Sequence, residues 1–289
     1  MAHLPSVLST LIEDTLRFEY LDGAVTPLHD THTTGLRILP YAVCAAVSSG
    51  TTQLYFDDTC DFTLPVGHGF VAPEGVRHCS TLNSPSNVSR WAHFRVTILN
   101  AVDAFRFFRV PHTMNKQAAK KLGDLCEELA ALPAAATDPW ELARIAQRKG
   151  LGFQLFALIA ENSQPHPEAT GLLDSIHRLL PVLQRIQAEP ERPMSLGEMA
   201  QQVTLSPSRF CAIFRRCFGL PPGEYQRNTR LTAAKLLLLD SEKTIEQIAY
   251  QLGFDDPFHF SKSFKKNSGM SPRQYRTKLR VGMWRNPAR

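Results

Sequence analysis

The feature that most constrains how this 289-residue chain can fold is an internal repeat in its last third. Two phenylalanines, a glycine, a proline and a tyrosine recur in the same order with an offset of 50 residues. The first copy comprises Phe210, Phe214, Gly219, Pro222 and Tyr225, and the second copy comprises Phe260, Phe264, Gly269, Pro272 and Tyr275. Such agreement at a single offset is hard to obtain by chance, so the sequence predicts two copies of one structural unit.

Each copy predicts two short helices separated by a tight turn. The first helix begins at a capping box, in which a Ser or Thr and a Glu or Gln three residues later bond to each other's backbone amides. The second helix begins where a capping residue precedes a proline. The capping boxes start at Ser195 and Thr244, and the capped prolines are Pro207, after Ser206, and Pro257, after Asp256. A short helix, a tight turn and a second helix make a helix-turn-helix motif.

The turn between the two helices differs in sequence between the copies. The offset falls to 49 residues in the first helix, so the second copy has one extra residue in its turn. Gly253 occupies a position that needs a positive φ, which glycine tolerates best. The first copy has Thr204 there, a β-branched residue that is strained in this conformation. We therefore expect the first turn to differ in detail from the second.

The second helix of each copy is predicted to bury its phenylalanine pair and to present polar and basic side chains on the other side. The major groove of DNA admits an α-helix, whose side chains then reach base edges and phosphates. The outward residues are Ser208, Arg209, Ala212, Arg215 and Arg216 in the first copy, and Phe258, His259, Ser261, Lys262, Lys265 and Lys266 in the second. The sequence thus predicts two DNA-recognition helices, with phosphate contacts from the adjacent basic pairs.

One long helix over Glu224–Leu239 is predicted to join the two units rigidly. If both recognition helices enter one face of B-DNA, they lie about one helical turn, ~34 Å, apart. The alternative is a plain helical bundle with an aromatic core. It accounts for the four phenylalanines, which we take as core residues, but not for the duplicated caps, turns and outward basic pairs.

The charge distribution agrees with a polyanionic partner for the C-terminal part. The net charge of +5 divides into +9 for residues 171–289, with 19 basic and 10 acidic residues, and −4 for residues 1–170, with 13 and 17. A basic half beside a mildly acidic half indicates that only the former meets nucleic acid.

Other classes of protein are disfavoured by composition. No apolar run approaches the ~18–20 residues of a membrane-spanning helix, and Met1–Thr10 lacks the features of a secretory signal. The six cysteines show no CxxC pairing, so we expect reduced, mostly buried thiols in a cytoplasmic protein.

From about Leu16 to Thr97 the sequence consists of short strand-like runs separated by turns, which is typical of an antiparallel barrel or sandwich. The clearest strand candidates are Arg37–Val47, Gln53–Phe56, Phe62–Leu64, Phe70–Ala72 and Trp91–Ile98. The chain is therefore expected to be of the α+β class. Its domains are predicted over residues 1–164, rich in strands, and 172–289, all helical.

Helical patterns begin after the strands. Asp138 and Pro139 suit the cap and first position of a helix, which Gly150 and Gly152 weaken in its middle. A later helix is predicted to restart at Pro181. The predicted helices cover residues 118–129, 138–159 and 172–186, with a linker at 162–170 and a break at 188–193.

The stretch Ile245–Arg276 (IEQIAYQLGFDDPFHFSKSFKKNSGMSPRQYR) closely resembles the C-terminal signature of the AraC/XylS family of bacterial transcription regulators. Leu196–Arg289 resembles the DNA-binding domain of this family throughout. The resemblance implies a bacterial cytoplasmic protein that binds double-stranded DNA and controls promoters through RNA polymerase. It also implies most base reading by the first recognition helix. The residues at reading positions are then Ser208, Cys211 and Ala212, followed by Phe258, His259, Ser261 and Lys262, and Ser206 completes the predicted DNA-binding set.

The N-terminal part resembles the sensory domain of the same family more weakly. GHGFVAPEGVRH (Gly67–His78), followed by WAHFRV (Trp91–Val96), is similar to its cupin-type barrel. The resemblance implies a cupin-like β-barrel that binds a small-molecule effector, together with helices that often dimerise. For this chain we expect a homodimer that forms through a helical dimerisation segment at residues 115–160.

Cupin barrels often hold metals through histidines, which here are His29, His32, His68, His78 and His93. No His-x-His with a following Glu occurs at the spacing of cupin enzymes, so we predict no metal, no cofactor and no catalytic residue. His78 and His93 are expected to be structural hydrogen-bonding residues. A small organic effector is favoured instead, and the residues expected to line its site are Arg37, Tyr41, Trp91 and His93.

Three hypotheses for the whole chain remain open. The first is a transcription activator that responds to a small ligand. The second is a DNA-binding regulator without a small ligand, gated by a protein partner or by its own abundance. The third is a cupin-type, metal-dependent enzyme fused to a DNA-binding module.

Overall fold

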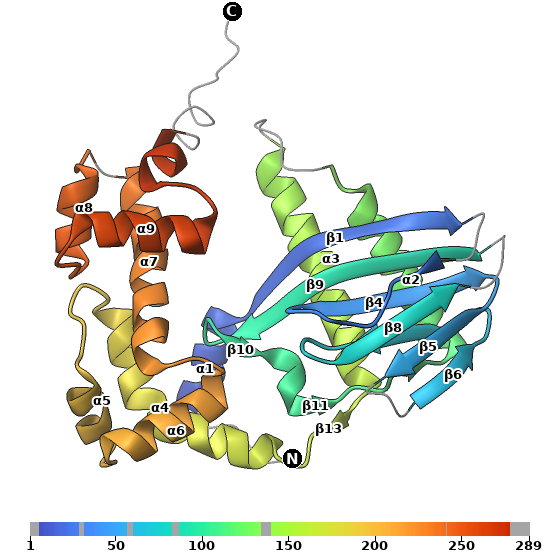
Figure 1. Ribbon diagram of the computed structural model, residues 1–289, viewed down its shortest axis with the longest axis horizontal. Helices are drawn as coiled ribbons and strands as arrows, with labels where there is room; N and C mark the ends of the chain where they lie inside the picture. The colour runs from blue at the N-terminus through green and yellow to red at the C-terminus, as the bar shows by residue number, and fades with distance from the viewer. Residues whose placement is uncertain are drawn as a thin grey trace, which may run out of the picture. The chain divides into compact units, whose positions relative to one another are not determined.

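The computed structural model describes residues 6–28, 32–56, 60–82, 87–133, 140–240 and 242–277. It divides into two compact units. The N-terminal unit, Ser9–Ala169, is rich in strands, and the C-terminal unit, Thr170–Arg289 with Met1–Leu8, is built from helices (Figure 1). The mixed α+β class predicted from the sequence is therefore confirmed.

The N-terminal unit contains two antiparallel sheets of five and six strands. The larger sheet consists of β1 (Arg17–Leu28), β4 (Ala42–Ser49), β7 (Gly69–Ala72), β9 (Asn87–Ile98), β10 (Val102–Asp103) and β12 (Thr113–Met114). The smaller sheet consists of β2 (His32–Thr33), β3 (Arg37–Ile38), β5 (Thr52–Phe56), β6 (Cys60–Leu64) and β8 (Arg77–Leu82). The order is β1-β9-β4-β7-β12 in the larger sheet, with β10 beside β9, and β2-β8-β5-β6 in the smaller, with β3 beside β8.

Strand β4 shows how the two sheets share a core, because it is buried on both faces. Val43, Ala45 and Val47 pack with residues of the smaller sheet. The alternate residues Ala42, Cys44 and Ala46 face the other way and pack against helices. A strand covered on both sides needs a continuous apolar run rather than an alternating one. Within the described residues the strands form two facing sheets, and closure of these sheets into a cupin-like barrel stays a prediction.

Two helices cover the outer face of the larger sheet, α2 (Lys116–Ala131) and α3 (Glu141–Glu161). Arg90 of β9 fixes α2 in place, because its guanidinium lies 2.5 Å from Asp124 and 3.5 Å from Glu127. The side chain of Arg90 crosses α2 at Gly123, where a Cβ atom would lie only 2.6 Å from the guanidinium. The glycine thus allows the ion pair to form against the helix backbone.

The remaining elements outside the helix-turn-helix units are short. They are α1 (Ser6–Thr15), η1 (Ala104–Phe107), and the paired strands β11 (Phe108–Arg109) and β13 (Gln164–Pro165). Strand β13 lies within residues 162–170, so the predicted linker is partly ordered secondary structure. The predicted strand over Arg37–Val47 is divided into β3 and β4. The predicted cap and first position of α3, Asp138 and Pro139, lie outside the described residues.

The C-terminal unit begins with α4 (Ala169–Ala188), which runs through Pro181 without interruption. The predicted restart at this proline is wrong. The residues on either side, Leu179, Leu180, Val182 and Leu183, are all buried, and their packing outweighs the hydrogen bond that proline cannot donate. The predicted break at 188–193 is confirmed. The later helices are α5 (Leu196–Gln202), α6 (Pro207–Phe218), α7 (Pro222–Asp240), α8 (Ile245–Gln251) and α9 (Pro257–Ser268).

The cysteines whose side chains are described are free thiols: Cys44, Cys79, Cys126, Cys211 and Cys217. Cys44 of β4 and Cys126 of α2 are buried with their Sγ atoms 3.6 Å apart, between the larger sheet and the helix. Within the described ranges, no helix combines the length and apolar character that a membrane crossing requires.

Gly152 of α3 has no room for a side chain, because a Cβ atom there would lie 2.1 Å from the Phe18 ring. We expect Gly152→Ala to lower the free energy of unfolding by roughly 1–3 kcal/mol, the usual cost of overpacking. Gly150 is a matched control on the same helix, with nothing within 4 Å of its Cβ position. Gly150→Ala should raise stability by roughly 0.5–1 kcal/mol. Denaturant titration followed by circular dichroism measures both, and equal effects would contradict this packing.

Candidate nucleic-acid interface

Both predicted capping boxes are confirmed. Ser195 Oγ accepts the amide of Glu198 at 3.3 Å, and the Glu198 carboxylate accepts the amide of Ser195 at 2.7 Å. Thr244 and Gln247 make the same pair of hydrogen bonds, at 3.1 and 2.8 Å. These bonds fix the first residue of α5 and of α8.

The starts of the recognition helices α6 and α9 are also capped as predicted. Ser206 Oγ accepts the amide of Arg209 at 3.3 Å, and the Asp256 carboxylate accepts the amides of Phe258 and His259 at 2.9 and 3.1 Å. Each helix then ends at a glycine with a left-handed backbone, which is Gly219 for α6 and Gly269 for α9. Ser206, predicted to contact DNA, therefore already uses its side-chain oxygen to begin α6.

The two turns share a left-handed backbone at Thr204 and Gly253, so they do not differ at this residue. They differ in detail after it, because the N-cap residues Ser206 and Asp256 have different backbone angles. Thr204 has a φ of 56° and Gly253 a φ of 69°, both left-handed. In each turn the next residue donates its amide to the first helix: Leu205 to Ala200 at 2.9 Å, and Phe254 to Ala249 at 3.0 Å. The extra residue of the second copy follows this turn, at Asp255. The first copy thus keeps the shared geometry at the expense of a strained threonine.

Equivalent side chains tie each unit to the helix that follows it. Gln226 of α7 bonds to the backbone amide and carbonyl of Met194, at 2.8 and 3.1 Å. At the equivalent position, Arg276 donates to the carbonyl of Lys243 at 2.7 Å. Met194 and Lys243 are the residues immediately before the two capping boxes. The repeat therefore extends from sequence to tertiary contacts.

Arg230 fixes α7 to the second unit. Its guanidinium donates to the carbonyl of Gly253 at 2.7 Å and lies 4.3 Å from the centre of the Phe254 ring. α7 also packs with α8 and α9 in one core that contains Leu231, Leu238 and Phe264. The linker helix thus contacts both units through specific bonds, as a rigid connection requires.

The outer face of α6 carries most of the predicted contact residues. Phe210 and Phe214 are fully buried, which confirms them as core residues. Ser208, Arg209, Ala212, Arg215 and Arg216 are exposed, and Cys211 is half-buried. The two adjacent arginines differ in surroundings, because Arg216 donates to Ser175 Oγ of α4 at 2.6 Å. Arg215 makes no such bond to α4 among the described contacts.

The outer face of α9 combines basic side chains with an exposed aromatic ring. Phe258, at its second residue, is 77% exposed, and His259, Lys262, Lys265 and Lys266 are exposed as well. Ser261 is half-buried. Phe260 and Phe264 are fully buried and form the other face of the helix. The structure therefore brings all six predicted residues of the second unit onto the outer surface of α9.

A groove between α7 and α9, here called the α7–α9 groove, includes residues that the sequence argument missed. Its charged and polar lining comprises Glu224, Arg227, Asn228, His259, Lys262, Ser263, Lys266 and Asn267. The sequence assigned α7 only as a spacer. The available signal was Arg227, a half-buried basic residue of that helix. Lys266 faces this groove, whereas Lys265 does not line it.

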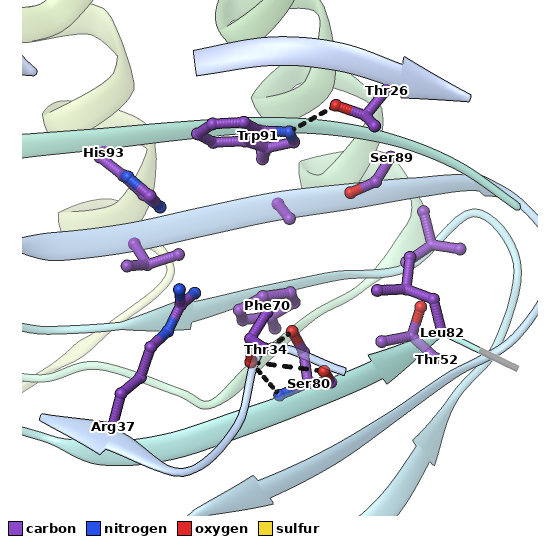
Figure 2. Close-up of a pocket in the computed structure, with 13 residues that line it drawn as sticks. Thr26, Thr34, Arg37, Thr52, Phe70, Ser80, Leu82, Ser89, Trp91 and His93 are labelled. Carbon is purple, nitrogen blue, oxygen red and sulfur yellow. Dashed lines mark hydrogen bonds between the residues drawn. The ribbon is translucent and has the colours of Figure 1, made fainter. Parts of the chain in front are cut away.

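The N-terminal unit contains a cavity of about 300 Å³ between its two sheets (Figure 2). Arg37, Trp91 and His93, three of the predicted effector residues, line it. Tyr41 is not among the lining residues but packs against His93, with ring centres 5.2 Å apart and the rings tilted. Alternation in the sequence could not show which side of each strand faces the cavity, so other lining residues were missed, including Thr34, Phe70, Ser80 and Leu82.

The histidines weighed as metal ligands are His29, His32, His68, His78 and His93. Among the described residues, no three His, Cys, Asp or Glu side chains are grouped as a metal site requires. His78 bonds through Nδ1 to the carbonyl of Val76 at 2.9 Å, and burial lowers its pKa. Burial also lowers the pKa of His93, and the charge of Arg37 lowers it further. His29 lies outside the described residues.

The C-terminal unit contains a segment that matches a known protein family. A family described as a helix-turn-helix domain matches residues 199–278. The arabinose operon regulatory protein of Escherichia coli (strain K12) is 38% identical over 81 residues, 28% of this chain and 28% of that protein. A solved transcriptional regulator from Chromobacterium violaceum, described as AraC-type, has 27% identity, covers 40% of this chain and 98% of its own, and has a TM-score of 0.35.

Residues 199–278 of the C-terminal unit form an AraC-type helix-turn-helix domain. The chain is also similar to the HTH-type transcriptional activator RhaR of Klebsiella pneumoniae, with 34% identity over 141 residues, 48% of this chain and 50% of that protein. The chain spans only 28% and 50% of the length of these two curated relatives. The matched family segment lies wholly within the C-terminal unit.

The two turns of the AraC-type domain provide a test of the strain at Thr204. Thr204→Gly should raise the free energy of unfolding by roughly 1 kcal/mol, because glycine adopts a positive φ without steric cost. Gly253→Ala should lower it, since a Cβ atom there would also lie 2.8 Å from Pro193 and 2.9 Å from the carbonyl oxygen of Glu191. Thermal unfolding measures both, and a destabilised Thr204→Gly protein would show that the threonine is not strained.

Proposed function

We propose that this protein is a sequence-specific DNA-binding transcription regulator whose activity is controlled by a small molecule. The observation that carries the proposal is the pair of recognition helices, α6 and α9. Both have capped starts and exposed polar and basic faces, and α7 links their units through specific contacts. Helices of this kind enter the major groove of double-stranded DNA. DNA as the partner implies a cytoplasmic site of action in a bacterium.

The two recognition helices are assigned different contributions. On α6, Ser208, Cys211 and Ala212 supply small side chains toward base edges, and Arg209 and Arg215 add positive charge beside them. On α9, His259 and Lys262 are able to donate hydrogen bonds to bases, and the exposed ring of Phe258 suits contact with a thymine methyl group. Arg227 and Lys266 of the α7–α9 groove are assigned to the phosphate backbone, which favours clustered cations.

The different surroundings of two adjacent arginines test this arrangement. Arg215→Ala should weaken binding to all duplex sequences and reduce the slope of log affinity against log salt by about one, because it removes one phosphate contact. Arg216→Ala should change the slope less, since Arg216 already bonds to Ser175 of α4. Fluorescence anisotropy with labelled duplexes at several salt concentrations measures both. Loss of binding only in Arg216→Ala would contradict the assignment of the α6 face.

The N-terminal unit is assigned the sensory role, with the cavity between its sheets as the effector site. The cavity combines apolar walls with a few polar groups, which is the usual character of a small-molecule site. We propose that effector binding leads the protein to activate transcription through contact with RNA polymerase. The alternative of a regulator gated by a protein partner predicts that no small molecule binds this cavity. The metal-dependent enzyme has no supporting observation among the described residues.

A homodimer is proposed through the helical segment that was expected to dimerise. The first half of α3 exposes apolar side chains: Leu142 is 77% exposed and Ile145 is 39% exposed, one helical turn apart. Apolar side chains that are exposed at helical spacing are typical of a helix that packs against another helix. Self-association would remove them from water and would present two DNA-binding domains to one operator.

Charged substitutions on α3 test the dimer. The double substitution Leu142→Lys with Ile145→Lys should convert a dimer into a monomer, because two lysines cannot be buried at a helix contact without partners. Val66→Lys is the matched control, since Val66 is an exposed apolar residue, 46% exposed, that lies outside α3. Sedimentation velocity over a range of concentrations measures the mass. A monomeric unsubstituted protein, or a dimer that survives both lysines, would rule out this interface.

A further inference from the structure

We infer that the cavity of the N-terminal unit takes a small monocarboxylate with an apolar body, held at its carboxylate by Arg37 and His93. This inference deepens the proposed effector role and rests on it. It is drawn from the side chains that line the cavity, their existing hydrogen bonds and the position of the one charged group among them.

The cavity has a positive charge at one end. Figure 2 shows the guanidinium of Arg37 pointing into the cavity toward His93, with Thr52, Leu82 and Ser89 at the other end. Arg37 is the only lysine or arginine among the described lining residues, and they include no Asp or Glu. Its hydrogen bond is a long one, from Nε to His78 Nε2 at 3.4 Å. The other guanidinium donors are therefore available to a ligand anion, which arginine binds through two parallel bonds.

His93 supports one negative charge on the ligand rather than two. Burial lowers the pKa of His93, which favours the neutral ring, and a neutral ring still donates one hydrogen bond. The ring is held by Trp91, with centres 4.7 Å apart, and by Tyr41, at 5.2 Å. Arg37 thus supplies a single positive charge that one carboxylate neutralises. A doubly charged phosphate would leave an unpaired buried charge, which is costly.

The remaining walls favour an apolar body over a sugar. Val43, Ala45, Val47, Phe70 and Leu82 contribute hydrocarbon surface. Several polar groups of the lining already have partners. Trp91 Nε1 donates to Thr26 at 2.9 Å, and Thr34 and Ser80 bond to each other. A polyol would need hydrogen-bond partners along its whole length, whereas these walls offer mainly methyl groups and ring faces.

Paired acids and amides test the inference on the full-length protein by isothermal titration calorimetry. The probes are hexanoate and phenylacetate, each with its neutral amide, and D-xylose as a polyol. At least one acid should bind roughly tenfold or more tightly than its amide, the usual range for a hydrogen-bonded charge pair. Arg37→Gln should remove this preference while the amide binds as before, and Arg37→Lys should keep part of it. Circular dichroism melting checks that both variants fold.

A cavity-filling substitution distinguishes a failure of the carboxylate assignment from a failure of the proposed effector site. Ala45→Leu adds bulk to a buried lining residue and should abolish binding of every probe. Equal binding of acid and amide that Ala45→Leu abolishes would overturn the carboxylate assignment and leave the effector cavity standing. The same holds if D-xylose binds and neither acid does, or if Arg37→Gln keeps the preference. Acid binding that survives Ala45→Leu would place the ligand elsewhere and overturn the proposed effector site itself.

Discussion

The C-terminal unit depends on the hydrogen bonds that fix where its helices begin. A recognition helix presents a defined set of side chains only if its first residue is defined, because a shift of one residue rotates the exposed face by about 100°. Ser206 and Asp256 provide that definition for α6 and α9, and the capping boxes at Ser195 and Thr244 provide it for the helices that support them. The outward position of the basic residues follows from these bonds.

Contacts between elements hold the two helix-turn-helix units together. Gln226 and Arg276 bond to the backbone just before each capping box, and Arg230 bonds to the turn of the second unit. Thr204 also helps to fix the position of a helix, because it lies in the turn before α6. Its left-handed backbone is unfavourable for a β-branched residue, yet it keeps the turn that orients α6, so surrounding contacts offset the local strain. The two units therefore share a left-handed turn residue despite the different side chains at that position.

The N-terminal unit depends on a different constraint, the double burial of β4. Its alternate residues fill one core between the sheets and another beneath α2 and α3. The small side chain of Ala45 lines the space left between the sheets, into which Arg37 projects from the neighbouring sheet. A charge at the end of an otherwise apolar cavity is expensive unless a ligand or water satisfies it. The charge of Arg37 is therefore one reason for which we propose this cavity as a binding site.

The sequence alone determined the features that local hydrogen bonds encode: the four helix starts, the positive φ at Gly253, and the buried phenylalanine pairs. Each of these features is encoded by residues that lie at most four positions apart in the sequence. Only the tertiary structure decided the features that depend on distant partners. Burial on both sides of Pro181 keeps α4 intact, Ser175 engages Arg216, and α7 joins α9 in a basic groove. The order of the strands and the lining of the cavity were equally beyond local patterns, because alternation shows that a strand has two faces but not what covers each.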